Sequence, residues 1–323
     1  AMALCPFVRS LLPLAMQLMT DSSSSSCAKT ASRIFSKLVQ LAPLVEESAE
    51  IRLITDGWSD NADKVMDHLI RGNALPPCEI HPTILDALST AGVSLRRYQL
   101  EGIAWLRFLQ SVKLNGALTD SMGLGKTLQA LVGVALAHTD THPMVVSKKS
   151  IVICPSSVLG HWMKEVKTFF PGNDIFRPFC VQGQKGKKKV PEECNLIITS
   201  YAVLRSDIDF LSRHKWCYCV LDEGHLLKNP KTATAKAARK LHAEYKLILT
   251  GTPVQNKVHE VWATFDFLMP NFLGSSSEFS KEFAGPIIKG QAHGASAIDI
   301  AAGMEKLKLL HQQVLPFILR REK

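Results

Sequence analysis

Lys126 and Thr127 close a glycine-rich stretch whose residue types suit the binding of a nucleotide. Gly123 and Gly125 lie in the same stretch, DSMGLGKT, between an apolar run and a segment of helical periodicity. Glycines let backbone N–H groups wrap phosphate oxygens, the lysine reaches the β- and γ-phosphates, and the threonine hydroxyl ligates Mg²⁺. Asp120 stands where the general phosphate-loop pattern has glycine. We therefore expect ATP and Mg²⁺ as cofactors; the alternative is a glycine-rich turn that happens to precede a helix.

Two adjacent acids, Asp222 and Glu223, follow a second apolar run. We expect Asp222 to hold the hydration shell of Mg²⁺ and Glu223 to orient and polarise the attacking water. Together with Lys126 they form the predicted catalytic set. The alternative is an acidic turn at a strand end, and the phosphate-loop pattern upstream argues against it.

A third candidate is the turn after the apolar run in LILTGTPVQN, residues 247–256. Its hydroxyls and amide, on Thr250, Thr252 and Gln255, are predicted to sense the γ-phosphate side and to relay its state to another surface. Alone this would be a common strand-to-turn pattern. Its order after the other two motifs makes it more specific.

The elements that must position these residues alternate between strands and helices from Ser94 onward. Such alternation predicts an α/β fold with a parallel sheet and helices on both faces. Ligands of such sheets bind at the carboxyl ends of the strands, which is where all three motifs fall. The predicted strands are Asn115–Thr119, Ser150–Cys154, Asn195–Thr199, Cys217–Leu221 and Lys246–Thr250.

The first part of the chain has a different pattern. Two amphipathic helical stripes within residues 1–45 predict the end of a helical repeat array, because one such pair is a unit of a helical solenoid. Residues 46–93 are expected to form a connector and residues 94–323 the α/β domain. No apolar run approaches the length of a membrane span. The net charge of +9 is compatible with an acidic partner such as nucleic acid.

From Leu95 to about Arg321 the ordered motifs resemble the first RecA-like lobe of the SWI/SNF-like remodeller ATPases, a superfamily 2 motor family. The resemblance implies that Gln99, in LRRYQLEGIAWL, contacts the adenine base. It also implies a coupling role for His225, whose other reading is a helix-start residue with a local hydrogen bond. The implied nucleotide-binding residues are Gln99, Gly123, Gly125, Lys126, Thr127 and Leu128, with Thr127 and Asp222 toward the metal.

The same resemblance implies a double-stranded DNA partner. The stretches ICPSSVLGHWMKEV and ITSY resemble motifs that contact a DNA backbone, with Ser156, Ser157, Thr199 and Ser200 as the expected donors. The basic stretch GQKGKKKV, residues 183–190, is either a further phosphate contact or a solvated loop. A helical protrusion is expected at about residues 265–315.

A narrower resemblance rests on Gly224, where most relatives have alanine, together with DFLMPNFLG, VLPFILRR and the upstream helical pair. These features resemble the Mot1-type branch, which removes TATA-binding protein from DNA in the nucleus and grips it through helical repeats of the HEAT type. The second RecA-like lobe, another expected partner, is absent from this sequence, so the chain alone is expected to hydrolyse ATP weakly or not at all. Alternatives are a non-catalytic interaction platform and a strand-separating helicase lobe.

Overall fold

The computed structural model describes residues 8–20, 25–41, 75, 77–139, 149–172, 175–182, 190–251 and 258–323. The chain divides into two units. One comprises residues 1–74 and 255–318, and the other comprises residues 75–254 and 319–323. Of the predicted connector, residues 46–74 and 76 lie outside the described residues.

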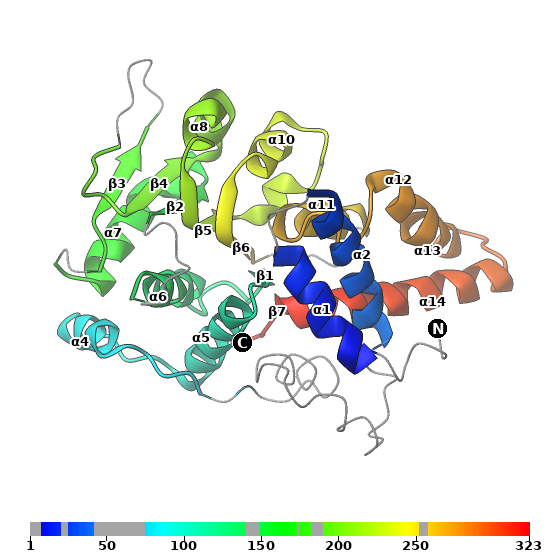
Figure 1. Cartoon of the computed structure of the whole chain (residues 1–323), viewed down its shortest axis with the longest axis horizontal. Helices are drawn as coiled ribbons and strands as arrows, with labels where there is room; N and C mark the ends of the chain where they lie inside the picture. The colour runs from blue at the N-terminus through cyan, green and yellow to red at the C-terminus, as the bar shows by residue number, and fades with distance from the viewer. Residues whose placement is uncertain are drawn as a thin grey trace. The chain divides into compact units, whose positions relative to one another are not determined.

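The unit of residues 75–254 and 319–323 is built on a seven-stranded sheet in the order β3-β4-β2-β5-β6-β1-β7 (Figure 1). The ladders between neighbours from β3 to β1 are all parallel. This arrangement confirms the predicted α/β fold. The strands are β1 Gly116–Leu118, β2 Ser150–Cys154, β3 Pro178–Val181, β4 Leu196–Ser200, β5 Lys215–Asp222, β6 His242–Leu249 and β7 Ile318–Leu319.

Helices lie on both faces of this sheet, as a parallel sheet requires. In Figure 1, α5 (Arg97–Ser111), α6 (Lys126–Thr139) and α7 (Leu159–Phe169) lie on one side, and α8 (Tyr201–Ser206) and α10 (Ala233–Arg239) on the other. All residues of β1, β2 and β4 are buried, in keeping with the largely apolar sequences of these strands. The remaining helices of this unit are α4 Pro82–Thr90 and α9 Ile208–Leu211.

Five of the strands match predicted ones, and two were not predicted. β3 is half-buried, lies at one edge of the sheet and begins with Pro178. A proline in a short apolar run argues against a central strand, which explains why this strand was not predicted. β7 has two residues and lies at the other edge. Its pairing depends on a sequence-distant neighbour, since Thr119 N–H donates to the Leu319 carbonyl at 2.7 Å.

The other unit packs one of the two N-terminal helices against residues between 258 and 318. Phe35 of α2 (Ser25–Leu41) packs in an aromatic cluster with Phe272 and Phe317, at ring-centroid distances of 6.0 and 6.3 Å. Arg33, also on α2, pairs with Glu278 at 3.0 Å. The apolar stripe of α2 is therefore buried against residues of the predicted protrusion.

The further elements of this unit are α1 Val8–Thr20, α11 Val258–Leu268, α12 Ser276–Phe279, a π-helical turn Ser280–Ala284, α13 Gly285–Gly290, α14 Ala297–Val314 and a 3-10 turn Leu315–Phe317. Among the described residues of the whole chain, no helix combines the length and apolar character that crossing a membrane demands.

Candidate nucleotide site

The three predicted motifs follow adjacent strands. β5, β6 and β1 are neighbours in the sheet and run parallel, so the segments that begin at Asp222, Thr250 and Asp120 leave the same edge. This edge is the usual place for a ligand of an open α/β sheet. The topology thus brings together residues that are separated by more than a hundred positions in sequence.

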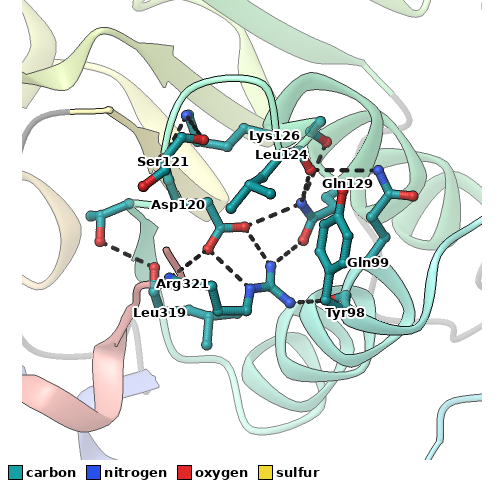
Figure 2. A network of polar contacts seen from close by, with 11 residues as sticks. Tyr98, Gln99, Asp120, Ser121, Leu124, Lys126, Gln129, Leu319 and Arg321 are labelled. Atoms are coloured by element: carbon teal, nitrogen blue, oxygen red, sulfur yellow. Dashed lines mark hydrogen bonds and ion pairs between the residues drawn. The ribbon is translucent and has the colours of Figure 1, made fainter. Parts of the chain in front are cut away.

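The phosphate loop has the backbone that its glycines predict. Gly123 and Gly125 have φ angles of +86° and +72°, in the left-handed region that favours glycine. The Lys126 ammonium donates to the carbonyls of Asp120 at 2.7 Å and Ser121 at 3.3 Å, so it lies over its own loop (Figure 2). Thr127 follows in the first turn of α6. A lysine and a hydroxyl at a helix start fit a polyphosphate with its Mg²⁺.

Burial and three acidic residues act on the charge of Lys126. Partial burial lowers the pKa of Lys126 below its ordinary 10.5, while Asp120, Glu223 and Asp222 act in the opposite direction. Since Asp222 and Glu223 also follow a strand that ends at the same edge of the sheet, the first two motifs lie at one candidate site. A bound nucleotide could therefore place its phosphates near Lys126 and its metal ion and attacking water near the acids.

Gln99 lies against the phosphate loop. Its Nε2 donates to the Leu124 carbonyl at 3.5 Å, and its Oε1 accepts from the Arg96 backbone N–H at 2.9 Å. A Cβ at position 125 would come within 2.5 Å of the Gln99 amide, so Gly125 permits this approach as well as the turn. Leu128 is buried in α6. The contact of Gln99 with a base stays a prediction.

Asp222 is held by residues that sequence reasoning missed. Trp162 of α7 donates its indole N–H to Asp222 Oδ2 at 2.8 Å, and the Glu223 backbone N–H donates to Oδ1 at 3.0 Å. The hydroxyl of buried Tyr201 donates to the Asp222 carbonyl at 2.7 Å. Burial, with the nearby Asp222 charge, raises the pKa of Tyr201 well above its ordinary value. Each carboxylate oxygen has further lone pairs, so the group can still accept from metal-bound water.

Glu223 has a strained backbone. Its φ of 53° and ψ of 51° are left-handed, which costs a residue with a Cβ about 1 kcal/mol or more. Its carboxylate Oε2 lies 3.1 Å from His225 Nδ1. Within the described part of the chain that nitrogen meets no hydrogen-bond criterion, so the two side chains approach without a directed hydrogen bond. Strain of this kind is typical of functional sites, and it turns the acid away from the path of the strand.

Gly224 is explained by its neighbour on β6. A Cβ at this position would lie 2.3 Å from Ile248 Cγ2, far inside van der Waals contact. Ile248 is itself buried and pairs with strands on both sides. The glycine that distinguishes this motif is therefore a packing requirement of this chain.

The third motif is described in part. Thr250 is buried, and its backbone N–H donates to the Leu118 carbonyl at 3.2 Å. A Cβ at Gly251 would lie 3.8 Å from Lys126 Nζ, so this turn borders the phosphate loop. Thr252 and Gln255, the other predicted coupling residues, lie outside the described residues.

The predicted DNA contacts separate into two groups. Ser156 and Ser157 are exposed in a short 3-10 turn after β2, where they can reach a ligand. Thr199 is buried and its hydroxyl donates to the Val181 carbonyl at 2.8 Å, while Ser200 caps α8 by accepting from Val203 N–H. The O–H donor of Thr199 is thus used within the fold, whereas Ser200 accepts through its oxygen and keeps its O–H donor. The contact of both residues with DNA stays a prediction. Residues 183–189 of the basic stretch lie outside the described residues.

A buried ion pair lies behind the phosphate loop and was also missed by sequence reasoning. The Arg321 guanidinium pairs with the fully buried Asp120 carboxylate, with Nε at 3.0 Å from Oδ1 (Figure 2). Gln129 of α6 contacts both members. The double arginine in VLPFILRR was the available signal, but only the fold brings it to Asp120.

A family model described as the SNF2-related domain matches residues 98–323. The chain belongs to this SNF2-related family. That membership confirms the resemblance predicted from the ordered motifs.

Two curated relatives match nearly the whole chain. It is 37% identical to TATA-binding protein-associated factor BTAF1 of Arabidopsis thaliana, over 99% of this chain and 16% of that protein. It is 35% identical to human TATA-binding protein-associated factor 172, over 98% of this chain and 18% of that protein. The chain thus spans less than a fifth of the length of these relatives.

Among solved structures, the SWI2/SNF2 ATPase core of Sulfolobus solfataricus in complex with dsDNA is similar. The TM-score is 0.63 at 36% identity, with 78% of this chain and 47% of that chain covered. A second structure, of the Sulfolobus solfataricus SWI2/SNF2 ATPase core domain, gives a TM-score of 0.59, also at 36% identity, with 77% of this chain and 45% of that chain covered.

Proposed function

We propose that this chain carries the ATP-binding lobe of a DNA-dependent translocase that remodels protein–DNA complexes. The observation that carries the proposal is the meeting of Lys126 with Asp222 and Glu223 at one edge of the sheet, where both acids act on the pKa of the lysine. Membership of the SNF2-related family supports ATP as the nucleotide. Mg²⁺ fits because Thr127 and Asp222 are oxygen donors, which this hard cation prefers.

The proposed roles follow from the geometry. Lys126, at the end of a loop rich in backbone N–H groups, attracts the β- and γ-phosphates. Trp162 holds the Asp222 carboxylate in one orientation, toward the water shell of the metal. Glu223 orients and polarises the attacking water. Thr127 and Asp222 would hold Mg²⁺, which would supply positive charge to offset the negative charge that develops during phosphoryl transfer.

The proposed macromolecular partners come from the relatives. The curated relatives are named as TATA-binding protein-associated factors, and the similar solved core is a complex with dsDNA. We extend both partners to the protein that contains this chain, with Ser156 and Ser157 as DNA-backbone contacts. Removal of TATA-binding protein from promoter DNA, action in the nucleus, and a second RecA-like lobe that completes the ATPase site belong to the same proposal.

The first experiment measures nucleotide binding by the chain. A fluorescent ATP analogue with Mg²⁺ is titrated into the wild type and into Lys126→Ala, with a change at the exposed Lys164 of α7, Lys164→Ala, as a matched lysine control. We expect binding by the wild type and the control, and a loss of about 100-fold in Lys126→Ala, because a charged phosphate contact is worth roughly 3 kcal/mol. Equal binding by Lys126→Ala contradicts the site.

The second experiment uses the full-length protein. We expect it to dissociate TATA-binding protein from a TATA duplex with ATP and not with a non-hydrolysable analogue. Glu223→Gln should lose ATPase activity and retain TATA-binding-protein binding. If Glu223→Gln still removes TATA-binding protein, the protein acts as an interaction platform and the motor proposal fails. Strand displacement during ATP hydrolysis would instead indicate a helicase.

A further inference from the structure

Arg321 lies at the centre of a buried polar network behind the phosphate loop. Its backbone N–H and its Nε each lie 3.0 Å from Asp120 Oδ1, and its Nη2 donates to Oδ2. The Asp120 side chain is wholly buried, and that of Arg321 is 18% exposed. The backbone N–H and two side-chain donors of one residue thus converge on one carboxylate, and lysine cannot reproduce the forked side-chain contact.

The network extends to the helix that carries Gln99. Arg321 Nη2 donates to Gln129 Oε1 at 2.6 Å, and Nη1 donates to the Tyr98 carbonyl. Gln129 Nε2 in turn lies 3.3 Å from Asp120 Oδ2 and 3.3 Å from the Leu124 carbonyl, within the loop itself. Figure 2 shows the guanidinium between the Asp120 carboxylate, the Gln129 amide and α5. One side chain therefore contacts both parts of the candidate nucleotide site.

Gly102 of α5 leaves room for this arrangement. A Cβ at this position would lie 2.0 Å from Gln129 Oε1 and 2.7 Å from Arg321 Nη2. The missing side chain at Gly102 of α5 thus leaves space for Gln129 and Arg321.

A backbone hydrogen bond also joins the phosphate loop to Arg321, since Ser121 N–H donates to the Arg321 carbonyl at 3.0 Å.

We propose that Arg321 is a positioning residue for nucleotide binding: it fixes the start of the phosphate loop through Asp120 and fixes that loop relative to α5 through Gln129 and Tyr98. The residue acts on the nucleotide through these groups and does not touch it. A buried carboxylate that lost its guanidinium would be uncompensated, and the loop that begins at Asp120 would change its backbone to relieve it. The inference rests on the proposed ATP site.

The test compares Arg321→Lys with Arg320→Lys, a neighbouring arginine whose ion pair with Glu322 is at the surface. Both variants of the chain are melted thermally and titrated with the fluorescent ATP analogue and Mg²⁺. We expect Arg320→Lys to match the wild type. We expect Arg321→Lys to remain folded and to bind about 10-fold more weakly, as when a group that orients a binding residue is removed.

Chemical rescue separates positioning from general support of the fold. Arg321→Ala is titrated in the presence and absence of low millimolar guanidinium, with methylammonium as the control cation. We expect guanidinium to restore part of the affinity and methylammonium to restore less, because only the planar ion reproduces the forked contact.

Each outcome decides the inference. A folded Arg321→Lys that binds like the wild type overturns it, as does equal rescue by the two cations. If either single variant fails to fold, Asp120→Asn/Arg321→Gln removes both charges together, and wild-type affinity in that variant overturns the inference. Failure of the wild type to bind the analogue refutes the nucleotide site itself, which the wild-type titration shows separately.

Discussion

The substitution Gly224→Ala tests whether packing against Ile248 fixes the motif that contains the two acids. The added Cβ would lie 2.3 Å from Ile248 Cγ2, whereas carbon atoms in contact lie about 3.5–4.0 Å apart. The atoms must therefore separate by more than about 1 Å. Ile248 cannot yield easily, because it is β-branched, buried and paired with β5 and β1.

Overpacking of this kind costs about 1–3 kcal/mol, and replacing a glycine returns about 0.4–1 kcal/mol through the unfolded chain. We expect a net loss of about 1–2 kcal/mol. At a slope of about 2 kcal/mol per molar, the urea midpoint falls by roughly 0.5–1 M. The midpoint is followed by tryptophan fluorescence in variants of the same chain, so only differences between them are interpreted.

Two second-site variants identify the responsible atom. Ile248→Leu moves the branch from Cβ and removes Cγ2, and Ile248→Val keeps both γ carbons. We expect Gly224→Ala/Ile248→Leu to recover about 1 kcal/mol relative to the sum of the single changes, and Gly224→Ala/Ile248→Val to recover none. A Gly224→Ala variant as stable as the wild type, or equal recovery by both second-site variants, would refute the reasoning.

Three further predictions address the site and the helical unit. Because burial lowers the pKa of Lys126, the ammonium loses its proton at a pH below 10.5. As the pH is raised, affinity for the ATP analogue should therefore begin to decrease before pH 10.5 is reached, and a decrease that begins only above pH 10.5 contradicts the prediction. Trp162→Phe removes a donor to Asp222, and ATP hydrolysis by the full-length protein should drop about 10-fold, with an unchanged rate as the contrary result. Phe35→Ala should destabilise the chain by about 3–5 kcal/mol in thermal or urea unfolding and Phe35→Leu by less; equal, small effects would show that the aromatic cluster contributes little.

The two N-terminal helices show what the spacing of apolar residues can and cannot predict. Their spacing predicted two amphipathic helices, and the structure has them at Val8–Thr20 and Ser25–Leu41. The pattern shows which face of α2 is apolar but not what covers it. The contacts of Phe35 with Phe272 and Phe317 join segments more than two hundred positions apart, and periodicity carries no information across that distance.

The sequence by itself predicted the nucleotide chemistry of the candidate site, and it contains the three motifs in their order. A glycine-rich loop with Lys126, and an acidic pair after a buried strand, depend on local residue types at fixed spacing, so they can be recognised without a fold. The parallel sheet follows from the same alternation of strand and helix patterns. The topology then places these local motifs at one edge.

Only the tertiary structure decided which groups hold those motifs in place. In the fold, the Thr199 hydroxyl donates to a backbone carbonyl and Trp162 donates to Asp222. Ile248 packs against Gly224, and Arg321 forms an ion pair with Asp120. Each of these contacts joins different elements of the fold, and its energy depends on burial and on distances of a few tenths of an ångström. The residue type fixes which hydrogen bonds and charges a side chain can offer, and packing in the fold determines which neighbour it contacts.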